Sequence, residues 1–403
     1  MIRKLMLVAG ALGAAWLVDA ANAQSASAAT YYVDGSCSAN GNGTGDGCAS
    51  SAGGSGAFRD PQSCFSAVRA GDTCLIKNGT YITSTNGNDP SVSGGFSVGA
   101  SGTASAPITI KNYPGHSPLL ANCAVSQTTY CSRPTITAPS REYVIIEGLR
   151  IHGGVWIYGV SETLNQGSRG MIFRNNEIDT GWGEVDDGNW AAFFIDGQSG
   201  AQFANNYLHD IYVPSGGGQQ SSGGCFKLYY NNDVVIENNT CSHVNIPNSQ
   251  AGGIDDKAHG MRNIHRYNWI QDVNTCIRVN NQIGSLPVSG VKIYGNVCIG
   301  AAGTARPALR LTLQIGDLEI YNNTLYGFAG GVMTEEGPIS NVRLYNNVFA
   351  NLTDNNLELY SMLLASGGVG NVRRLSSDRM PPPRTITPGR RYPSGGNQLC
   401  GRP

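Results

Sequence analysis

The most constraining feature of the sequence is an asparagine that recurs at nearly constant intervals between short, largely apolar segments. The intervals are 30, 33, 29, 28, 27 and 24 residues, and the asparagines are Asn176, Asn206, Asn239, Asn268, Asn296, Asn323 and Asn347. Each is the fourth residue of a six-residue segment, and a related segment at 146–151 has Leu149 in that place. The interval is too short for a strand–helix–strand unit with a full helix.

A recurring asparagine has a physical role where a chain turns a corner. Asparagine tolerates the left-handed backbone conformation of a tight corner, and its amide can hydrogen-bond to the asparagine above and below when coils stack. The repeat therefore predicts an all-β solenoid, a parallel β-helix. A β-sandwich or propeller would instead show hairpin dipeptides, or blades of about 40 to 50 residues. We expect the β-helix to span 24–360, with a short helix from Pro61 to Ala70 capping its N-terminal end.

The two ends of the chain differ from this pattern. Residues 1–23 contain two basic residues, an apolar run from Leu5 to Val18 and the small-residue sequence Ala21-Asn22-Ala23, which together are typical of a secretory signal peptide. The apolar run is too short to span a bilayer comfortably, so we expect no membrane partner. The segment 361–403 holds seven arginines, no lysine and three consecutive prolines from Val372 onward, which predicts an irregular or disordered basic tail.

Composition narrows the class of protein. A net charge of −1 and 14% charged residues argue against a nucleic-acid partner. Eleven cysteines without any CxxC pair indicate disulfides, in agreement with a secreted or periplasmic location. Separately, we expect the protein to be a monomer. The pairs closest in sequence are Cys37–Cys48, Cys64–Cys74, Cys123–Cys131, Cys225–Cys241 and Cys276–Cys298, with Cys400 left over.

A second series of strands lies between the asparagine corners. Alternation predicts that one side chain of each strand points into the solenoid: Phe193, Phe226, Ile254, Ile277, Leu309 and Val332. Asp256 is an acid at such an inward position, and nothing in the sequence explains it. The outward positions include four of the 27 basic residues of the chain, namely Lys227, Lys257, Arg278 and Arg310.

Lys257 and Arg278 are the candidate catalytic pair. They lie one coil apart and offset by two positions, so on strands about 4.8 Å apart their long side chains can meet over one ligand. A row of basic and polar groups on a flat sheet face suits an extended anionic polysaccharide. β-Elimination from a uronic acid needs a cation on the carboxylate and a base for the adjacent proton, so we assign Lys257 as base and Arg278 as neutraliser. Candidate substrate contacts are Lys227, Tyr229, Asp255, His259, Asn280 and Arg310, with Tyr229 or His259 as proton donor.

Other interpretations of these residues stay open. Asp255 could form an ordinary surface ion pair with Lys227 or Arg278, worth under about 1 kcal/mol, in a non-catalytic glycan-binding β-helix. A glycoside hydrolase needs two carboxylates about 5 to 9.5 Å apart, for which only Asp196 and Asp255 are candidates, two coils apart. The loop with Glu184 and Asp186-Asp187-Gly188 could bind Ca²⁺ through carboxylates or be a plain turn.

Three segments of the N-terminal half are GDTCLIKNGTY (71–81), SGTASAPITIKNYPG (101–115) and EYVIIEGLRIHG (142–153). They resemble the N-terminal coils of secreted right-handed parallel β-helix polysaccharide lyases of family 6, which includes alginate lyases and chondroitinase B. IDDKAHG followed by CIRVN resembles the pattern of that family in which a lysine base is followed, one coil later, by a carboxylate-neutralising arginine. The resemblance covers about residues 30–350 and implies the same roles for Lys257 and Arg278.

The chain departs from the family 6 pattern around this pair. Ala258 follows the lysine where the family has serine, and Val279-Asn280 follows the arginine where it has His-Gly. Gln250, Ala251 and Gly252 stand where acidic calcium ligands are expected.

A shorter resemblance, to family 9 pectate lyases, rests on Asp186-Asp187-Gly188 followed by Phe226-Lys227-Leu228. It implies Lys227 as base and calcium held by the aspartates.

Overall fold

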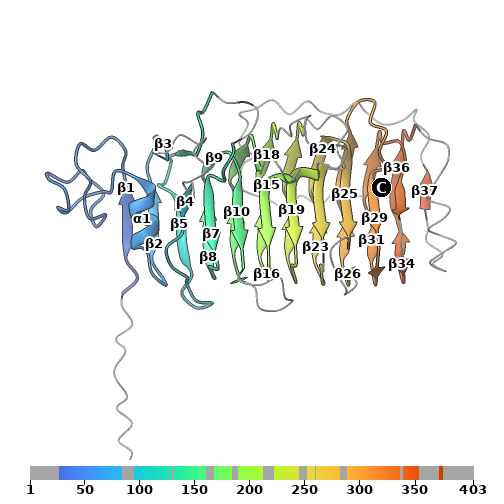
Figure 1. Cartoon of the computed structure of the whole chain (residues 1–403), viewed down its shortest axis with the longest axis horizontal. Helices are drawn as coiled ribbons and strands as arrows, with labels where there is room; N and C mark the ends of the chain where they lie inside the picture. Colours follow the sequence, from blue (N-terminus) through green and yellow to red (C-terminus); the bar gives the residue numbers. More distant parts are fainter. Residues whose placement is uncertain are drawn as a thin grey trace, which may run out of the picture.

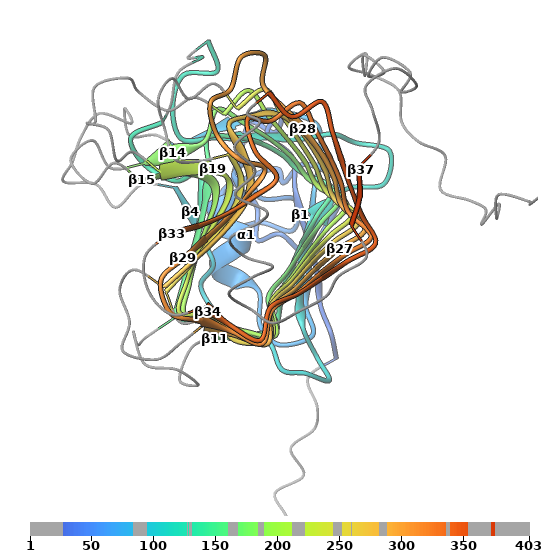
Figure 2. The same ribbon diagram turned by 90° about the vertical axis from the view of Figure 1, so that its right-hand side faces the viewer.

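The computed structural model describes residues 27–83, 95–126, 128, 131–159, 168–183, 189–211, 222–244, 252–258, 260–281, 288–335, 339–353 and 372–374. Over these residues the chain winds into coils stacked along one axis, from β1 (Thr30–Val33) at the blue end to β36 (Asn347–Ala350) near the other (Figure 1). Figure 2, turned by 90°, shows the sheets as the sides of a solenoid. The fold is a right-handed parallel β-helix, as predicted.

Three long sheets form the walls. Sheet 1 consists of β1, β2 (Thr73–Ile76), β5 (Ile108–Asn112), β8 (Val144–Glu147), β12 (Ile172–Arg174), β17 (Gln202–Ala204), β20 (Val235–Glu237), β23 (Ile264–Arg266), β27 (Lys292–Tyr294), β31 (Glu319–Tyr321) and β35 (Arg343–Tyr345). Sheet 2 consists of β3 (Thr80–Ile82), β6 (Leu119–Ala121), β9 (Arg150–His152), β13 (Glu177–Asp179), β18 (Tyr207–His209), β21 (Thr240–Ser242), β24 (Trp269–Val273), β28 (Val297–Gly300), β32 (Thr324–Tyr326), β36 and β37 (Val372–Arg374).

Sheet 3 carries the second series of strands. Its parallel strands are β4 (Phe96–Ser97), β7 (Ile136–Pro139), β10 (Val155–Tyr158), β15 (Asn189–Asp196), β19 (Ser222–Tyr229), β22 (Gly252–Lys257), β25 (Thr275–Asn280), β29 (Leu309–Thr312) and β33 (Val332–Glu335). β14 (Trp182–Gly183) pairs antiparallel with the start of β15, and Figure 2 shows this part of β14, β15 and β19 projecting from the solenoid. Two small parallel sheets complete the coils: β11 (Ser168–Arg169) with β16 (Gln198–Ser199), and β26 (Val288–Ser289) with β30 (Ile315–Gly316) and β34 (Ile339–Ser340).

The repeated asparagines form a continuous hydrogen-bonded ladder at the corner between sheets 1 and 2. Asn239 is typical: its Nδ2 donates to Asn268 Oδ1 at 3.0 Å and to the Phe203 carbonyl at 2.9 Å, while its Oδ1 accepts from Asn206 Nδ2 and from the Asn206 backbone N–H. The same contacts run from Asn176 to Asn347. Each amide is thereby satisfied inside the wall, as a buried polar group must be.

One part of the corner prediction is wrong. The left-handed conformation belongs to the residue before each ladder asparagine, for example Asn175 (φ 57°), Asn205 (φ 56°) and Asn238 (φ 54°). The ladder asparagine is held in place by its amide contacts, and its exposed neighbour makes the turn. At these corners, the first of two adjacent asparagines adopts the left-handed conformation of the turn, and the second forms the hydrogen bonds of the ladder.

The interior is apolar, as alternation predicts. Phe193, Phe226, Ile254, Ile277, Leu309 and Val332 are all at most 2% exposed. Aromatic side chains stack from coil to coil, with Phe193 and Phe226 having ring centroids 5.3 Å apart and planes 9° apart. Parallel stacking at the coil spacing makes the core continuous along the axis.

The N-terminal end is capped by α1 (Pro61–Ala67), which is shorter than the predicted 61–70. Asp60 accepts a hydrogen bond from the Ser63 N–H and so starts the helix. Phe65 and Val68 are fully buried, so the helix covers the apolar end of the first coils. At the other end, β37 lies within the segment predicted to be an irregular tail and extends sheet 2 by one strand. The predicted signal peptide lies outside the described residues.

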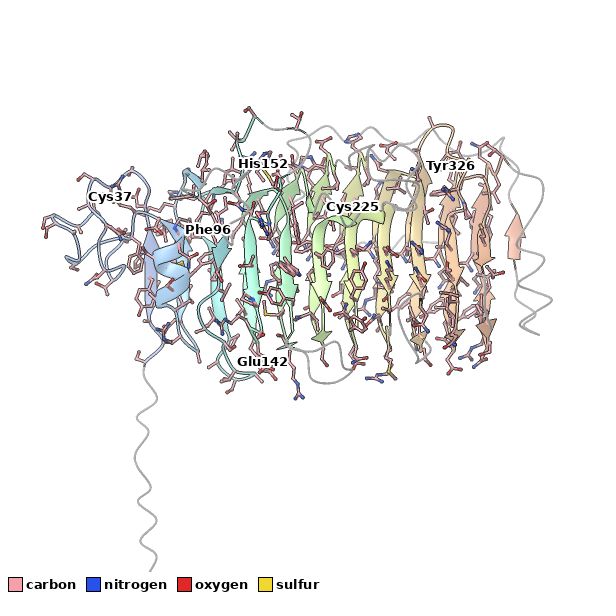
Figure 3. The ribbon with its side chains drawn as sticks, viewed as in Figure 1. Cys37, Phe96, Glu142, His152, Cys225 and Tyr326 are labelled. Atoms are coloured by element: carbon pink, nitrogen blue, oxygen red, sulfur yellow. A yellow bond between two sulfur atoms is a disulfide. The ribbon has the colours of Figure 1, made fainter. Side chains whose placement is uncertain are left out.

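The five pairs of cysteines that are closest in sequence all form disulfides: Cys37–Cys48, Cys64–Cys74, Cys123–Cys131, Cys225–Cys241 and Cys276–Cys298. Cys225 on β19 is labelled in Figure 3. Such a set forms in an oxidising compartment, which indicates a non-cytoplasmic protein. Cys400 lies outside the described residues. No helix in the described part of the chain is long and apolar enough to cross a membrane.

The two asparagine roles predict different mutational costs. Asn239→Ala removes an amide that satisfies buried backbone and side-chain groups on both neighbouring coils, so we expect a loss of roughly 2 to 4 kcal/mol in the free energy of unfolding. Asn238→Gly keeps a residue that adopts positive φ freely, so its effect should stay below about 1 kcal/mol. Urea unfolding of both variants checks this, and equal losses would contradict the ladder's role.

Candidate active site on sheet 3

The predicted site residues lie in two rows along the outer face of sheet 3. Strand register places Lys227, Asp255, Arg278 and Arg310 opposite one another on successive coils, which we call row 1. Row 2, two residues further along each strand, contains Tyr229, Lys257, Asn280 and Thr312. The predicted offset of Lys257 and Arg278 is therefore confirmed.

The charged side chains of these rows are buried, although they lie on the outer face of the sheet. Lys227 is 0% exposed, Asp255 3%, Arg278 5% and Lys257 9%. Burial on this scale also removes the interpretation as a solvated surface ion pair, because charges held away from water need specific partners. Alternation in the sequence gives the face that a side chain occupies but does not reveal whether that face is covered.

Asp255 is the central anion of row 1. Its Oδ2 lies 3.5 Å from Lys227 Nζ and its Oδ1 lies 3.9 Å from Arg278 Nε. Burial alone would raise the pKa of Asp255, but Arg278, Lys227 and Lys257 outweigh burial and hold that pKa below its usual value. Asp255 is therefore ionised, and it balances only part of the positive charge around it.

Lys227 has the opposite balance. Its complete burial lowers the pKa of its ammonium group to about 7; Asp255 opposes this shift, while Lys257 and Arg278 add to it. A lysine with this pKa is a mixture of charged and neutral forms near neutral pH. The buried cluster therefore holds less positive charge than the residue types suggest.

Arg278 is the least satisfied of these charged groups. In the described residues its guanidinium donates no hydrogen bond, and its nearest ionic contact is the 3.9 Å approach to Asp255. A good guanidinium–carboxylate pair has N–O distances of about 2.7 to 2.9 Å. A buried guanidinium with donors to spare is suited to receive a carboxylate from a ligand.

Lys257 lies against Tyr229. Its Nζ is 3.3 Å from the phenol oxygen and 5.2 Å from the ring centroid, and Lys227 Nζ lies 5.6 Å from the same centroid. Asn280, 0% exposed, is the direct neighbour of Lys257 on the next coil. Amine and phenol are thus in hydrogen-bond contact, an arrangement that can pass a proton between them. His259, the other predicted proton donor, lies outside the described residues.

An aromatic group continues both rows toward the N-terminal end. Phe194 is the register partner of Lys227 and Trp156 that of Phe194, while Tyr158 and Asp196 continue row 2. Trp156 and Tyr158 were not predicted as site residues, although the alternating segment Val155–Tyr158 is a signal for outward aromatic side chains. Asp196 and Asp255, the candidate hydrolase carboxylates, lie two coils apart and in different rows.

Asp256, the unexplained inward acid, is satisfied within the solenoid. It is fully buried, accepts a hydrogen bond from Asn263 Nδ2 at 3.1 Å, and lies 2.9 Å from His265 Nε2. The two partners follow β22 in the next stretch of chain. Asp256 therefore ties the turn after Lys257 to the following strand and stays apart from the outer rows.

The calcium site implied by the family 6 resemblance does not fit these residues. A Cβ atom on Gly252 would lie 1.6 Å from the Thr275 carbonyl oxygen, so no acidic side chain can stand at that position. The two clusters of potential metal ligands in the described residues each contain two cysteines that are joined in a disulfide. The loop with Glu184, Asp186 and Asp187 lies outside the described residues.

Comparisons with known proteins place the fold. An alginate lyase from Paenibacillus sp. str. FPU-7 has a TM-score of 0.50 at 17% identity, covering 78% of this chain and 95% of its own. XylC, in a complex with xylose, has a TM-score of 0.51 at 10% identity, covering 85% and 70%. Pectate lyase Pel9A has a TM-score of 0.46 at 16% identity, covering 87% and 78%.

The alginate lyase and XylC, with TM-scores of 0.50 and 0.51, share the fold of this chain. No protein-family model matches the sequence, and no curated protein matches it either. Because the alginate lyase and XylC are both less than 25% identical to this chain, they establish its fold alone.

The pKa of Lys227 predicts a pH-dependent stability. Between about pH 7 and the unfolded value of about 10.4, the unfolded chain binds a proton that folded Lys227 has released, so stability from this group rises with pH over that window. Lys227→Met should lose this rise. Urea unfolding from pH 6 to 10 measures it, with the half-exposed Lys292→Met as control. The same pH slope in Lys227→Met and wild type would contradict the shift.

Proposed function

We propose that the protein is a polysaccharide lyase that cleaves a uronate-containing polysaccharide by β-elimination at the two rows of sheet 3. The observation that carries the proposal is Arg278: 5% exposed, with no hydrogen bond from its guanidinium in the described residues and only a long contact to Asp255. A uronate carboxylate would supply the missing acceptors in a two-point contact. Arg310, opposite Arg278 on the next coil, adds positive charge beside it.

The proposed reaction uses the contact between Lys257 and Tyr229. With Arg278 neutralising the carboxylate, the proton on the adjacent carbon becomes acidic, and the neutral Lys257 amine removes it. The electron pair forms the carbon–carbon double bond as the bond to the glycosidic oxygen breaks. The Tyr229 hydroxyl gives its proton to the leaving oxygen, and Lys257 then returns a proton to the phenolate across their 3.3 Å contact.

Lys227 is the other lysine that can act as base, because its pKa of about 7 leaves part of it neutral at neutral pH. Its 0% exposure and its contact with Asp255 favour a supporting role. In that role it holds Asp255 and keeps positive charge near the carboxylate. Lys257 retains some exposure and contacts the proposed proton donor, so we assign the base to Lys257.

The expected activity is release of an unsaturated uronate product, followed by its ultraviolet absorbance, from at least one of alginate, pectate, chondroitin sulfate or hyaluronan. Lys257→Ala should lower kcat by about 100- to 10,000-fold, and Arg278→Ala by about 100- to 1000-fold. Lys292→Ala, on the outer face of sheet 1, serves as control. Reducing ends formed without the chromophore would indicate a hydrolase instead, and binding without any product a glycan-binding protein.

The two lysines and the tyrosine give separable results. Tyr229→Phe keeps the ring but removes the proton donor, so we expect kcat to fall by about 100-fold or more while KM changes little. Lys227→Met should retain measurable turnover. If Lys227→Met abolishes turnover and Lys257→Ala does not, the base has been assigned to the wrong lysine.

A further inference from the structure

The aromatic group next to the cationic rows is built as a surface of its own. Trp156 lies 4.3 Å from Tyr158 and 5.3 Å from Trp182, measured between ring centroids, and Trp182 lies 5.6 Å from Phe194. Phe194 in turn stacks on Tyr229 at 5.4 Å with planes 19° apart. Because Tyr229 also contacts Lys257, the aromatic rings lead directly to the proposed reaction centre.

Backbone geometry fixes one wall of this surface. Trp182, 4% exposed, donates from its indole N–H to the Val155 carbonyl at 3.4 Å. A Cβ atom on Gly154 would lie 2.0 Å from Trp182 Cδ1. Only glycine, which has no side chain, therefore makes room for the indole ring at this position. The residues Trp156, Tyr158 and Phe194 are partly exposed beside it. A rigid set of partly exposed rings can pack on the C–H face of a pyranose with little loss of conformational freedom.

The charge of this surface differs from that of the rows beyond it. The outward positions of β7, β10 and β15 within the rows contain no lysine or arginine: Thr137, Pro139, Trp156, Tyr158, Phe194 and Asp196. One strand further, β19 begins the series of four basic residues. A bound uronate carboxylate needs a cation beside it. The charged side chain among these six positions is Asp196, which is negative and would repel such a carboxylate.

We infer that the surface formed by Trp156, Tyr158 and Phe194, supported from behind by the buried Trp182, binds an uncharged sugar next to the uronate bound at Arg278. The substrate is then a polymer in which uronate and uncharged sugars are neighbours, and not an unbroken run of uronates. This inference rests on the proposed function for the position of the uronate. It assigns substrate selection to residues that take no part in the proposed elimination.

The test compares two kinds of polymer. Hyaluronan and unsulfated chondroitin alternate a uronate with an uncharged N-acetylated sugar, whereas alginate and polygalacturonate are runs of uronates. We expect kcat/KM to be at least about tenfold higher on an alternating polymer. Trp156→Ala should lower kcat/KM on that polymer by about five- to tenfold, mainly through KM, and leave the uronate runs nearly unaffected. Trp156→Phe keeps an aromatic ring, so it should retain most of the kcat/KM that Trp156→Ala loses.

Met333→Ala is the matched control. Met333 is the apolar register partner of Arg310, beyond the cationic end of row 1, and lies outside both proposed binding surfaces. It should change neither kcat/KM value. Circular dichroism of each variant shows whether the β-helix is intact, and Phe194→Ala provides a second truncation if Trp156→Ala does not fold.

Binding separates failure of this inference from failure of the proposed function. Affinity electrophoresis of Lys257→Ala in gels containing each polymer measures binding without cleavage. If no polymer is cleaved but alternating polymers are bound better and Trp156→Ala removes that preference, the lyase proposal fails and the inference holds. Equal or better binding and cleavage of uronate runs, or equal losses on both kinds of polymer in Trp156→Ala, would overturn the inference.

Discussion

The structure depends on the hydrogen bonds that join each coil to the next, and the asparagine ladder is where these bonds involve side chains. Each ladder amide bonds to backbone and side-chain groups on neighbouring coils, so a slip of one residue would break contacts in both directions. Such a slip would also turn every side chain of a strand to the opposite face. The ladder on one corner thereby fixes which residues become neighbours on sheet 3, far from the asparagines themselves.

This constraint explains why so much of the fold could be predicted. The equivalent asparagines, which recur every 24 to 33 residues, give the register. Register together with alternation gives the inward phenylalanines and the offset between Lys257 and Arg278. The disulfides needed no register, because each of the five joins two cysteines that are 8 to 22 residues apart in the sequence. The corner conformation was misplaced by one residue because both Asn175 and Asn176 are asparagines, and only hydrogen-bond geometry separates the residue that turns from the residue that bonds.

The site was less predictable because burial of an outer face is a property of the assembled chain. Alternation placed Lys227 and Asp255 outward, and an outward lysine ordinarily reaches water, yet Lys227 is 0% exposed. The site was predicted from its basic residues. Trp156 and Tyr158 were therefore missed, since they belong to a coil with no basic residue in either row. Asp256 shows the reverse case: its partner His265 is nine residues away and enters the interior only after the chain has turned.

Burial decides what the charged rows can do. In a low-dielectric setting, Arg278, Lys227 and Lys257 share one carboxylate, Asp255, and burial lowers the pKa of Lys227 to about 7, so that Lys227 gives up part of its charge. A full positive charge on every buried lysine and arginine around Asp255 would be costly. Arg278 cannot release its proton, so it stays positively charged. Its 3.9 Å contact to Asp255 balances that charge poorly. One strand away, across the β15–β19 pairing, the surface becomes aromatic and acidic. The surface therefore changes from aromatic to cationic, and so to one that favours an anionic ligand, over a single strand spacing of about 4.8 Å. This spacing is on the scale of one sugar ring.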